Sequence, residues 1–323
     1  TVILVKDTTK AYGDLARGYR SRFSIPVVAI TGSAGKTTTK ELAASVLSKR
    51  FCLLKNYQTE NNEIGVAKTL LSLRPEHQLA VLELGTNHFG EIKRLADMGM
   101  PTVSVLTNIG ESHLEFFKNR LGVFKEKAHI FKSLTRKNFL VYNSDDDLLK
   151  TIAKKNVSAK KVTFGIDGKA FYQAKNIIFA QKNLSFTVGR HPFLLKTLSR
   201  ENIYNALAAI ALGRLFGCSW ESIRQSLRRV EFPRGRQNIV KVSGIWLIDD
   251  TYNANPTSVS SALKTMSRFP ARGKKFFVFG DMLELGKISQ QAHRRIGQWV
   301  AGQGIDGFFT YGRWSKVSAQ EAK

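Results

Sequence analysis

The sequence predicts an α/β protein of two domains, and three patterns support this prediction. Apolar runs rich in β-branched residues alternate with segments of helical periodicity, which is typical of a mostly parallel sheet covered by helices. Strand-like runs without intervening helices follow and indicate a small antiparallel appendage. The alternation resumes near the end of the chain, where we expect a second α/β domain. A length of 323 residues fits two domains of ordinary size.

The first half of the chain carries most of the alternation. Apolar residues recur at helical spacing over residues 8–23, with Asp7 or Thr8 available as the N-cap. Residues 25–30 form an apolar run that predicts a strand, and a glycine-containing turn joins it to a helix reaching Leu47. Further elements are expected in order: a strand at 80–84, a helix at 91–98, a strand at 102–106, a helix at 123–134 and a strand at 139–142.

The second half predicts the appendage and the second domain. The turn-rich residues 232–236 mark the boundary between domains. The expected elements are appendage strands at 162–165, 177–180, 184–188 and 193–198, helices at 202–216 and 222–230, and then strands at 245–248, 275–279 and 308–311 with helices at 258–266 and 290–301. We therefore assign 25–233 to a central domain and 234–323 to an incomplete C-terminal domain. Residues 1–24 are expected to be a linker and helix from an N-terminal domain outside this chain.

Composition excludes several classes of protein. No apolar stretch approaches the roughly 20 residues that a membrane-spanning helix needs, and the first ten residues lack the features of a secretory signal. Cys52 and Cys218 have no C-x-x-C spacing, which favours two reduced thiols over a disulfide framework or a zinc site. We expect a cytoplasmic protein that acts as a monomer.

The net charge of +25 raises the possibility of a nucleic-acid interface. The basic residues, however, are scattered along the chain and do not gather in one tail or one stripe with aromatic residues. A solvated basic surface is the favoured interpretation, and a basic nucleotide-binding module acting on nucleic acid is the alternative. A small substrate rich in phosphate would be attracted by the same charge.

A glycine-rich segment, T-G-S-A-G-K-T-T at residues 31–38, lies between a predicted strand and a predicted helix. There the backbone N–H groups of Gly32 to Gly35 can surround phosphates at a helix N-terminus. Lys36 would contact the phosphates, and the Thr37 hydroxyl is placed to hold Mg²⁺. Ile30 stands where the longer motif has glycine, so this is the short G-x-x-G-K-T form. The alternative is a glycine-rich turn with a solvated lysine.

Two further candidates follow neighbouring strands. Glu83 ends an apolar strand at the edge of the sheet where ligands bind, and a Mg²⁺ ligand is favoured over a stray surface acid. His113 follows the next strand, and a ligand and a hydrogen-bonded structural histidine are equally open. Lys127 lies at helical spacing from apolar residues, which favours an inward or boundary position, and by pattern is a snorkelling lysine.

Polar segments follow two other strands. Residues 249–256 (DDTYNANP) offer acid, amide and hydroxyl groups that suit a nucleotide sugar or base. The acidic run 145–147 could imitate a metal site, but its position in a turn favours a solvated loop.

Together these segments resemble the Mur ligases, the ATP-dependent amide-forming enzymes of peptidoglycan synthesis. The branch that adds D-alanyl-D-alanine looks most similar. The resemblance rests on residues 32–38, 61–65 (NNEIG), 83–88 (ELGTNH), 113–115 (HLE), 202–206, 249–256 and 280–286 (GDMLELG). It implies a central P-loop ATPase domain followed by a Rossmann-like domain.

The resemblance also implies roles for individual residues. Lys36, Glu83, His113 and Lys127 match catalytic positions, and Thr37, Glu83, His113 and Lys127 would hold two Mg²⁺ ions. Lys127 matches a lysine that takes up CO₂ as a carbamate. The resemblance places ATP against Gly32, Ser33, Ala34, Gly35, Lys36, Thr37, Thr38, Asn205, Arg236 and Asp250, and we assign substrate contacts to Asn61, Asn62, Tyr252, Asn253 and Asn255.

The implied reaction joins D-alanyl-D-alanine to UDP-MurNAc-tripeptide through an acyl phosphate, with ADP formed from ATP. A Mur-like ligase with a different amine acceptor is one alternative. A catalytically silent nucleotide-binding paralogue is another.

Overall fold

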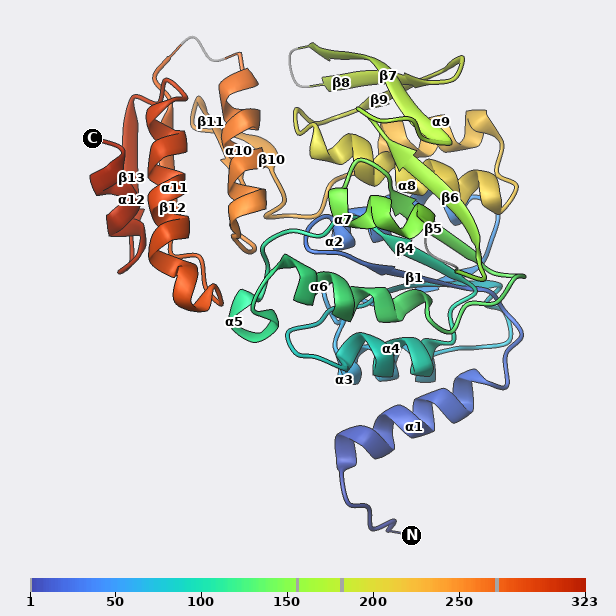
Figure 1. The fold of residues 1–323 in the computed structure, drawn as a ribbon. Helices are drawn as coiled ribbons and strands as arrows, with labels where there is room; N and C mark the ends of the chain where they lie inside the picture. Colours follow the sequence, from blue (N-terminus) through green and yellow to red (C-terminus); the bar gives the residue numbers. More distant parts are fainter. Residues whose placement is uncertain (1, 155–156, 181–182, 271–272) are drawn as a thin grey trace.

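The computed structural model describes residues 2–154, 157–180, 183–270 and 273–323. Thr1, which the sequence analysis places in the linker, lies outside these ranges. Figure 1 shows a large body built on one central sheet, with a smaller group of helices and strands from the C-terminal part beside it. Helix α1 packs below the large body against α3 and α4.

Nine strands form the central sheet, in the order β2-β3-β1-β4-β5-β6-β7-β8-β9. Pairing is parallel from β2 to β7 and antiparallel from β7 to β9. The strands are β1 (Val27–Thr31), β2 (Leu53–Lys55), β3 (Leu79–Glu83), β4 (Val103–Leu106), β5 (Phe139–Asn143), β6 (Lys160–Gly165), β7 (Tyr172–Ala180), β8 (Asn183–Val188) and β9 (His191–Leu195). The predicted α/β class is confirmed.

The predicted appendage needs one correction. We expected the strand at 162–165 to belong to it, but β6 pairs in parallel with β5 and extends the main sheet. Only β7, β8 and β9 are antiparallel, and they continue the same sheet. A run of four apolar residues does not reveal the direction of its neighbour, because parallel and antiparallel strands share the same local pattern.

Helices cover both faces of the sheet. They are α1 (Thr8–Arg20), α2 (Lys36–Leu47), α3 (Glu63–Leu71), α4 (Glu91–Gly99), α5 (Leu114–Phe117), α6 (Arg120–Lys127), η1 (Ala128–Phe131), α7 (Asp147–Lys150), η2 (Thr151–Lys154), α8 (Glu201–Leu215) and α9 (Trp220–Arg229). The helix predicted at 123–134 is wrong in its bounds, since the α-helix ends at Lys127 and tightens into one 3₁₀ turn.

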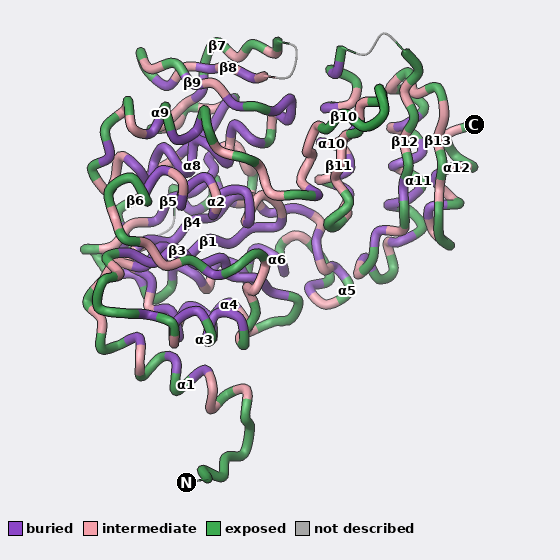
Figure 2. The backbone as a smooth tube through the Cα atoms, turned by 180° about the vertical axis from the view of Figure 1, so that it is seen from behind, coloured by how far each residue is buried: buried purple, intermediate pink, exposed green. Residues whose placement is uncertain are grey.

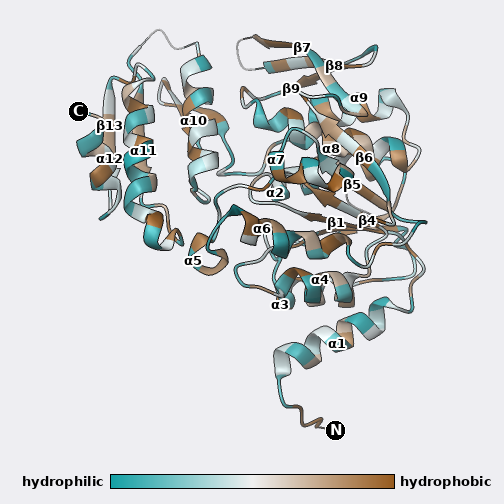
Figure 3. Cartoon of the chain, in the orientation of Figure 1, coloured by the Kyte–Doolittle hydropathy of each residue, from teal (hydrophilic) through white to brown (hydrophobic). Residues whose placement is uncertain are grey.

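Two hydrophobic cores lie on opposite faces of the sheet, and alternating side chains of the buried strands pack into one or the other. In β1, Val28 and Ile30 pack with α2, α8 and α9, while Val27 and Ala29 pack with α1, α3 and α4. This period of two is the geometry of a strand buried on both faces. Figure 2 shows the buried residues concentrated in this sheet and its covering helices, and Figure 3 shows the same strands as hydrophobic.

The C-terminal part has its own small core, made by α10, α11 and the inner face of one strand pair. The expected three strands are instead four, in two separate two-stranded sheets: β10 pairs antiparallel with β11, and β12 pairs parallel with β13. The elements are β10 (Asn238–Val242), β11 (Ile245–Asp249), α10 (Pro256–Arg268), β12 (Phe276–Gly280), η3 (Gly286–Ile288), α11 (Ser289–Ala301), β13 (Gly307–Tyr311) and α12 (Ser315–Glu321).

Candidate active site

The glycine-rich segment forms a tight loop between β1 and α2, as the sequence predicts. Gly32 passes so close to the segment that follows strand β4 that a Cβ there would lie 1.8 Å from Thr107 Oγ1. Gly35 has φ +81°, and a Cβ there would lie 2.4 Å from Asn205 Oδ1. Both positions therefore require glycine, the first for close approach and the second for close approach and backbone conformation.

Hydrogen bonds from the segment after β4 hold this loop in place. Ser33 N donates to Asn108 O at 3.0 Å, and Ala34 N donates to Asn108 Oδ1 at 2.9 Å. Lys36 Nζ folds back onto Gly32 O at 2.8 Å. Burial lowers the pKa of Lys36, and the charge of Arg236 adds to this while Glu83 opposes it. The loop is thus fixed before any phosphate binds.

Glu83 lies at the centre of the candidate site. Its side chain is 1% exposed, and its Oε1 accepts from Asn61 Nδ2 at 2.7 Å and from Thr37 Oγ1 at 3.2 Å. Its Oε2 is buried and has no hydrogen-bond partner among the described residues, although Lys40 Nζ lies 3.9 Å away. A buried carboxylate oxygen without a hydrogen bond is costly unless a cation binds it.

Sequence reasoning missed two residues that hold Glu83 in place. Asn56, fully buried, accepts from Glu83 N at 2.9 Å and donates to Glu83 O at 3.1 Å. Lys40, also fully buried, donates to Asn56 O at 2.9 Å and to Gln58 O. Lys40 follows the glycine-rich motif by one helical turn, so its spacing from Lys36 was a usable signal. Asn56 gave no local signal.

His113 meets a residue from the C-terminal part. Its backbone has φ +52°, and its Nδ1 makes a short hydrogen bond to Glu284 Oε2. Burial lowers the pKa of His113, Lys127 and Lys36 lower it further, and Glu284 opposes the shift. Glu284 lies in the 280–286 segment that carried part of the resemblance, but its partner is 171 residues away in sequence.

Lys127 is buried, which overturns the interpretation of a snorkelling lysine. Its side chain is 1% exposed at the end of α6, and no hydrogen bond joins its amine to a described residue. Burial lowers the pKa of Lys127 well below its usual value, and the nearby charge of Lys36 lowers it further while Glu126 opposes the shift. A neutral amine at this depth is available for chemistry that an ammonium cannot do.

The central residues fit a magnesium site. Glu83 supplies a free buried oxygen, Thr37 a hydroxyl beside it, and His113 an imidazole whose neutral form is favoured. Within the described ranges, no group of three or more His, Cys, Asp or Glu side chains is arranged to hold a metal. A small number of protein ligands is sufficient for Mg²⁺, because this ion usually keeps several water ligands and takes others from substrate phosphates.

The C-terminal part brings cationic and acidic groups toward this site. Arg236 Nη2 lies 3.5 Å from Thr37 Oγ1, and its guanidinium stacks 3.9 Å from the centre of the Tyr252 ring. Burial raises the pKa of Asp250 to about 6, while Arg236 and Gln237 oppose the shift. Arg236 therefore bridges the glycine-rich loop and the 249–256 segment.

Other predicted residues have structural contacts of their own. Asn62 caps α3, Asn255 caps α10, and Asn253 accepts from the backbone of Ala254. Asn205 Nδ2 donates a hydrogen bond to Asn202 Oδ1 at 3.0 Å, and Asn205 Oδ1 accepts one from Thr39 Oγ1. Thr38 is buried at the start of α2.

The acidic run 145–147 is neither a metal site nor simply solvated. Asp145 accepts from three backbone N–H groups between Ile166 and Gly168, and these bonds lower its pKa despite its burial. Asp146 caps α7, and Asp147 pairs with Arg120. The three carboxylates therefore stabilise the local backbone and the start of α7 through hydrogen bonds and one ion pair.

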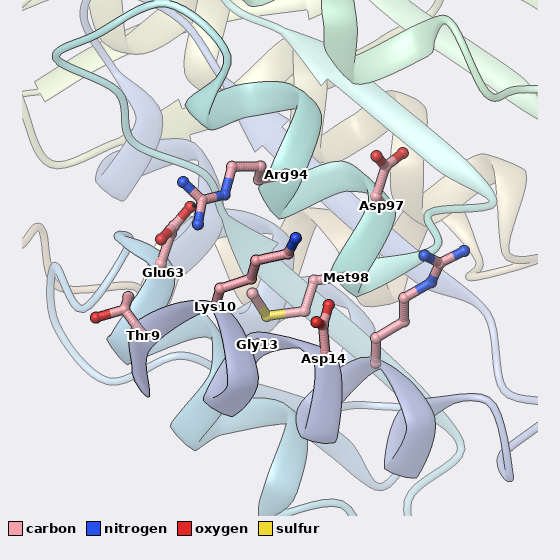
Figure 4. A pocket seen from close by; sticks show the side chains of 9 residues that line it. Thr9, Lys10, Gly13, Asp14, Glu63, Arg94, Asp97 and Met98 are labelled. Atoms are coloured by element: carbon pink, nitrogen blue, oxygen red, sulfur yellow. Dashed lines mark ion pairs between the residues drawn. The ribbon is translucent and has the colours of Figure 1, made fainter. Parts of the chain in front are cut away.

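A small cavity of about 190 Å³ lies elsewhere, between α1, α3 and α4. Figure 4 shows charged side chains around it, including Arg94, whose Nε lies 2.6 Å from Glu63 Oε1. None of the predicted site residues lines this cavity. In the described part of the chain, no helix is long and apolar enough to cross a membrane.

The geometry defines a P-loop nucleotide-binding protein with a buried carboxylate beside the phosphate loop. Profile comparison identifies the Mur ligase middle domain over residues 30–213 and the Mur ligase glutamate ligase domain over residues 235–323. The chain belongs to the Mur ligase family, and it is an ATP-dependent ligase.

Named relatives and solved structures agree. The UDP-N-acetylmuramoyl-tripeptide–D-alanyl-D-alanine ligases of Bacillus subtilis and Escherichia coli are each 35% identical, over 99% and 97% of this chain and 70% of their own length. A crystal structure of MurF from Acinetobacter baumannii has a TM-score of 0.93 at 33% identity and is covered over 71% of its length by 99% of this chain. MurF ligase from Thermotoga maritima, solved with ADP, has a TM-score of 0.88 at 28% identity, with 98% of this chain covering 73% of it.

Proposed function

We propose that this protein adds D-alanyl-D-alanine to UDP-MurNAc-tripeptide, with ATP converted to ADP, in the synthesis of peptidoglycan precursors. The observation that carries the proposal is the meeting of two segments at one site. The glycine-rich loop and Glu83 come from the central part, and Arg236 and Glu284 reach Thr37 and His113 from the C-terminal part. The relatives that carry this activity in their names match nearly the whole chain.

The loop from Gly32 to Thr38 binds the ATP phosphates through its backbone N–H groups and the start of α2. Lys36 leaves its contact with Gly32 O and pairs with a phosphate, because a full negative charge is a better partner than a carbonyl. Arg236 adds a second cation from the opposite side. Asn205 and Asp250 lie toward the base and the ribose in this proposal.

Thr37, Glu83, His113 and the carbamate of Lys127 would hold two Mg²⁺ ions. When bound, Mg²⁺ would neutralise negative charge on the ATP phosphates and so reduce their repulsion of the substrate carboxylate. Glu83 contributes the buried Oε2 that has no hydrogen-bond partner, and His113 contributes a neutral nitrogen.

Lys127 reacts with CO₂ as a neutral amine. The lone pair of Nζ forms a bond to the carbon of CO₂, the electrons of one C=O π bond move to oxygen, one proton passes from the nitrogen to water, and a carbamate anion results. The lowered pKa of Lys127 supports this step, because only the unprotonated amine has a free lone pair. The product carries a negative charge beside Lys36, where a protonated Lys127 would add a second positive charge.

The substrate carboxylate attacks the γ-phosphorus of ATP, ADP leaves, and the acyl phosphate is attacked by the amine of D-alanyl-D-alanine with release of phosphate. Asn61, Asn62, Tyr252, Asn253 and Asn255 are the proposed substrate contacts. Contact between the two parts of the chain excludes water from the reactive acyl phosphate. We also infer a cytoplasmic monomer with two domains, 25–233 and 234–323.

The test is phosphate release from Mg-ATP by the full-length gene product that contains this chain, supplied with UDP-MurNAc-tripeptide. Release that depends on added D-alanyl-D-alanine is expected. Release with a single amino acid but not with the dipeptide would indicate a ligase with another acceptor. Retained ATP binding without release under either condition would indicate a silent paralogue.

A further inference from the structure

We propose that the segment 107–115 couples docking of the C-terminal part to the shape of the phosphate loop, with Glu111, Glu284 and Arg295 as positioning residues. This inference builds on the proposed function, because it concerns the same nucleotide site. Its structural basis is that one short segment makes contacts in two directions.

On its inner side, the 107–115 segment is bound to the phosphate loop. Asn108 accepts from the backbone of Ser33 and Ala34 and donates from Nδ2 to Ala34 O at 3.0 Å. Ser112 Oγ donates to Ser33 Oγ at 3.0 Å, and Thr107 Oγ1 donates to Ala34 O at 2.6 Å. A shift of this segment therefore moves the loop that holds the phosphates.

On its outer side, the same segment is bound to the C-terminal part. Glu111 pairs with Arg295 of α11, and His113 pairs with Glu284. The backbone N–H of Glu115 donates to Glu284 O at 3.1 Å. These contacts come from two separate pieces of the C-terminal part, so they fix its orientation as well as its distance.

Close packing reinforces these polar contacts. A Cβ at Gly110 would lie 2.8 Å from Thr257 Oγ1 at the start of α10, and a Cβ at Gly286 would lie 3.0 Å from Glu115 Cα. The two glycines allow backbone of each part to approach the other. A larger side chain at either position would hold the parts away from each other.

The backbone at both ends of the His113–Glu284 contact is unusual. His113 has φ +52° and Glu284 has φ +58°, a region that residues other than glycine rarely adopt. Such conformations persist where surrounding contacts enforce them, and they are concentrated at functional and switching sites. The two strained residues bond each other across the junction.

The Glu111–Arg295 ion pair and the His113–Glu284 hydrogen bond suit a contact that opens and closes. The Glu111 and Arg295 side chains are 26% and 38% exposed, and the His113 and Glu284 side chains are 18% and 39% exposed. Partly exposed pairs contribute little to folding, so each part keeps its own core when they separate. The pairs select one docked orientation because each acid must meet its own partner.

The test compares Arg295→Ala with Arg294→Ala. The control removes the same charge one residue away, where the guanidinium lies 3.2 Å from Glu321 within the C-terminal part. Hydrogen exchange of the amides of residues 107–115 and affinity for a non-hydrolysable ATP analogue are measured in both variants. Arg295→Ala should speed exchange in this segment and weaken nucleotide binding about fivefold or more, whereas Arg294→Ala should match the parent protein.

The charge-reversed pair Glu111→Arg with Arg295→Glu should restore both readouts, because the ion pair is re-formed in the opposite sense. Arg295→Lys serves if the reversed pair folds poorly, and it should lie between the parent and Arg295→Ala. Parent-like exchange and affinity in Arg295→Ala, or no recovery in the reversed pair, would overturn the proposal. Neither readout needs ligase turnover, so a failed ligase assay would count against the proposed function alone.

Discussion

The central and C-terminal parts of the molecule hold their functional groups in opposite ways. Glu83, at the end of a fully buried strand, and Lys127, at the end of α6, are each 1% exposed. Tyr252 is 50% exposed, and strands β10 to β13 present one apolar face outward, with Ile245 and Val278 more than 70% exposed. The comparison indicates that the central groups are held within one core, while Arg236 and Glu284 of the C-terminal part act by approaching that core.

Lys127→Ala should have the largest effect and is the strongest test of this comparison. Loss of the carbamate should lower turnover at least about a hundredfold, and added small carboxylates should restore part of it. The protein should still fold, with some loss of stability, because truncating a fully buried side chain leaves a cavity although no hydrogen bond to a described residue is lost. Turnover is measured by phosphate release and stability by thermal unfolding.

Lys125→Ala is the matched control, because Lys125 is an exposed lysine on the same helix. It should leave turnover unchanged. Parent-like activity in Lys127→Ala would remove the carbamate from the mechanism.

Glu83→Gln should have the next largest effect. The amide keeps the size of the side chain but loses the anionic Oε2, so we expect a loss of roughly tenfold to a hundredfold in affinity for Mg-ATP. Titration of Mg²⁺ at fixed ATP measures it. Glu76→Gln is the control, since Glu76 is an exposed glutamate outside the site. If both variants need the same Mg²⁺ concentration, Glu83 is not a ligand.

Gly32→Ala should affect stability and binding together. Its Cβ would collide with Thr107, and we expect a loss of about 1–3 kcal/mol in the free energy of unfolding, with weaker nucleotide binding. Gly18→Ala in α1 meets nothing within 4 Å and should stabilise the protein by about 0.5–1 kcal/mol. Chemical denaturation of both variants measures the contrast. Equal stabilities would show that the phosphate loop tolerates displacement.

The smallest expected effect is the pH dependence of stability that Asp250 causes, and it tests the electrostatics of the C-terminal part. Its folded pKa of about 6 lies above the usual value of 3.8, so the folded state holds a proton that the unfolded state releases. The contribution of Asp250 to stability should therefore fall as pH rises from about 4 to about 6, by about 1 kcal/mol after allowance for solvent, and it is measured as the difference between the parent protein and Asp250→Asn. Thermal unfolding across this range measures it, and nucleotide affinity should rise as Asp250 ionises.

Asp250→Asn should remove the fall in stability, whereas Asp249→Asn should keep it, because Asp249 bonds Thr251 within its own loop. A fall that persists in Asp250→Asn would assign the proton to another group.

Much of the central part was predictable from local pattern. The strand and helix periods located β1, β3, β4 and β5, and the edge rule placed Glu83 and His113 at one end of the sheet. Burial of Lys127 was not predictable, since the spacing of a lysine on an amphipathic helix fits a boundary position equally well. How deeply the Lys127 side chain is buried depends on how α6 packs against its neighbours.

The C-terminal part was harder to predict because its signals are weak or distant. β10 has no buried residue, so the apolar alternation that identifies strands is absent. The Glu284 contact joins residues far apart in sequence, and no local rule specifies it. Asn255 followed by Pro256 is a helix-start signal, and the structure uses it as one.

Asn56 has a consequence for how the sheet makes room for ligands. Strand β2 ends at Lys55, and the amide of Asn56 bonds both the N–H and the carbonyl of Glu83, as another strand would. One side chain thus replaces a rung of backbone pairing. The main chain is free to turn away there without leaving polar groups of β3 unsatisfied, and the end of β3 borders a loop instead of a neighbouring strand. Replacing Asn56 with aspartate would remove the donor to Glu83 O and place a second carboxylate beside Glu83. An isosteric change at a residue without a proposed catalytic role would therefore alter the charge of the site.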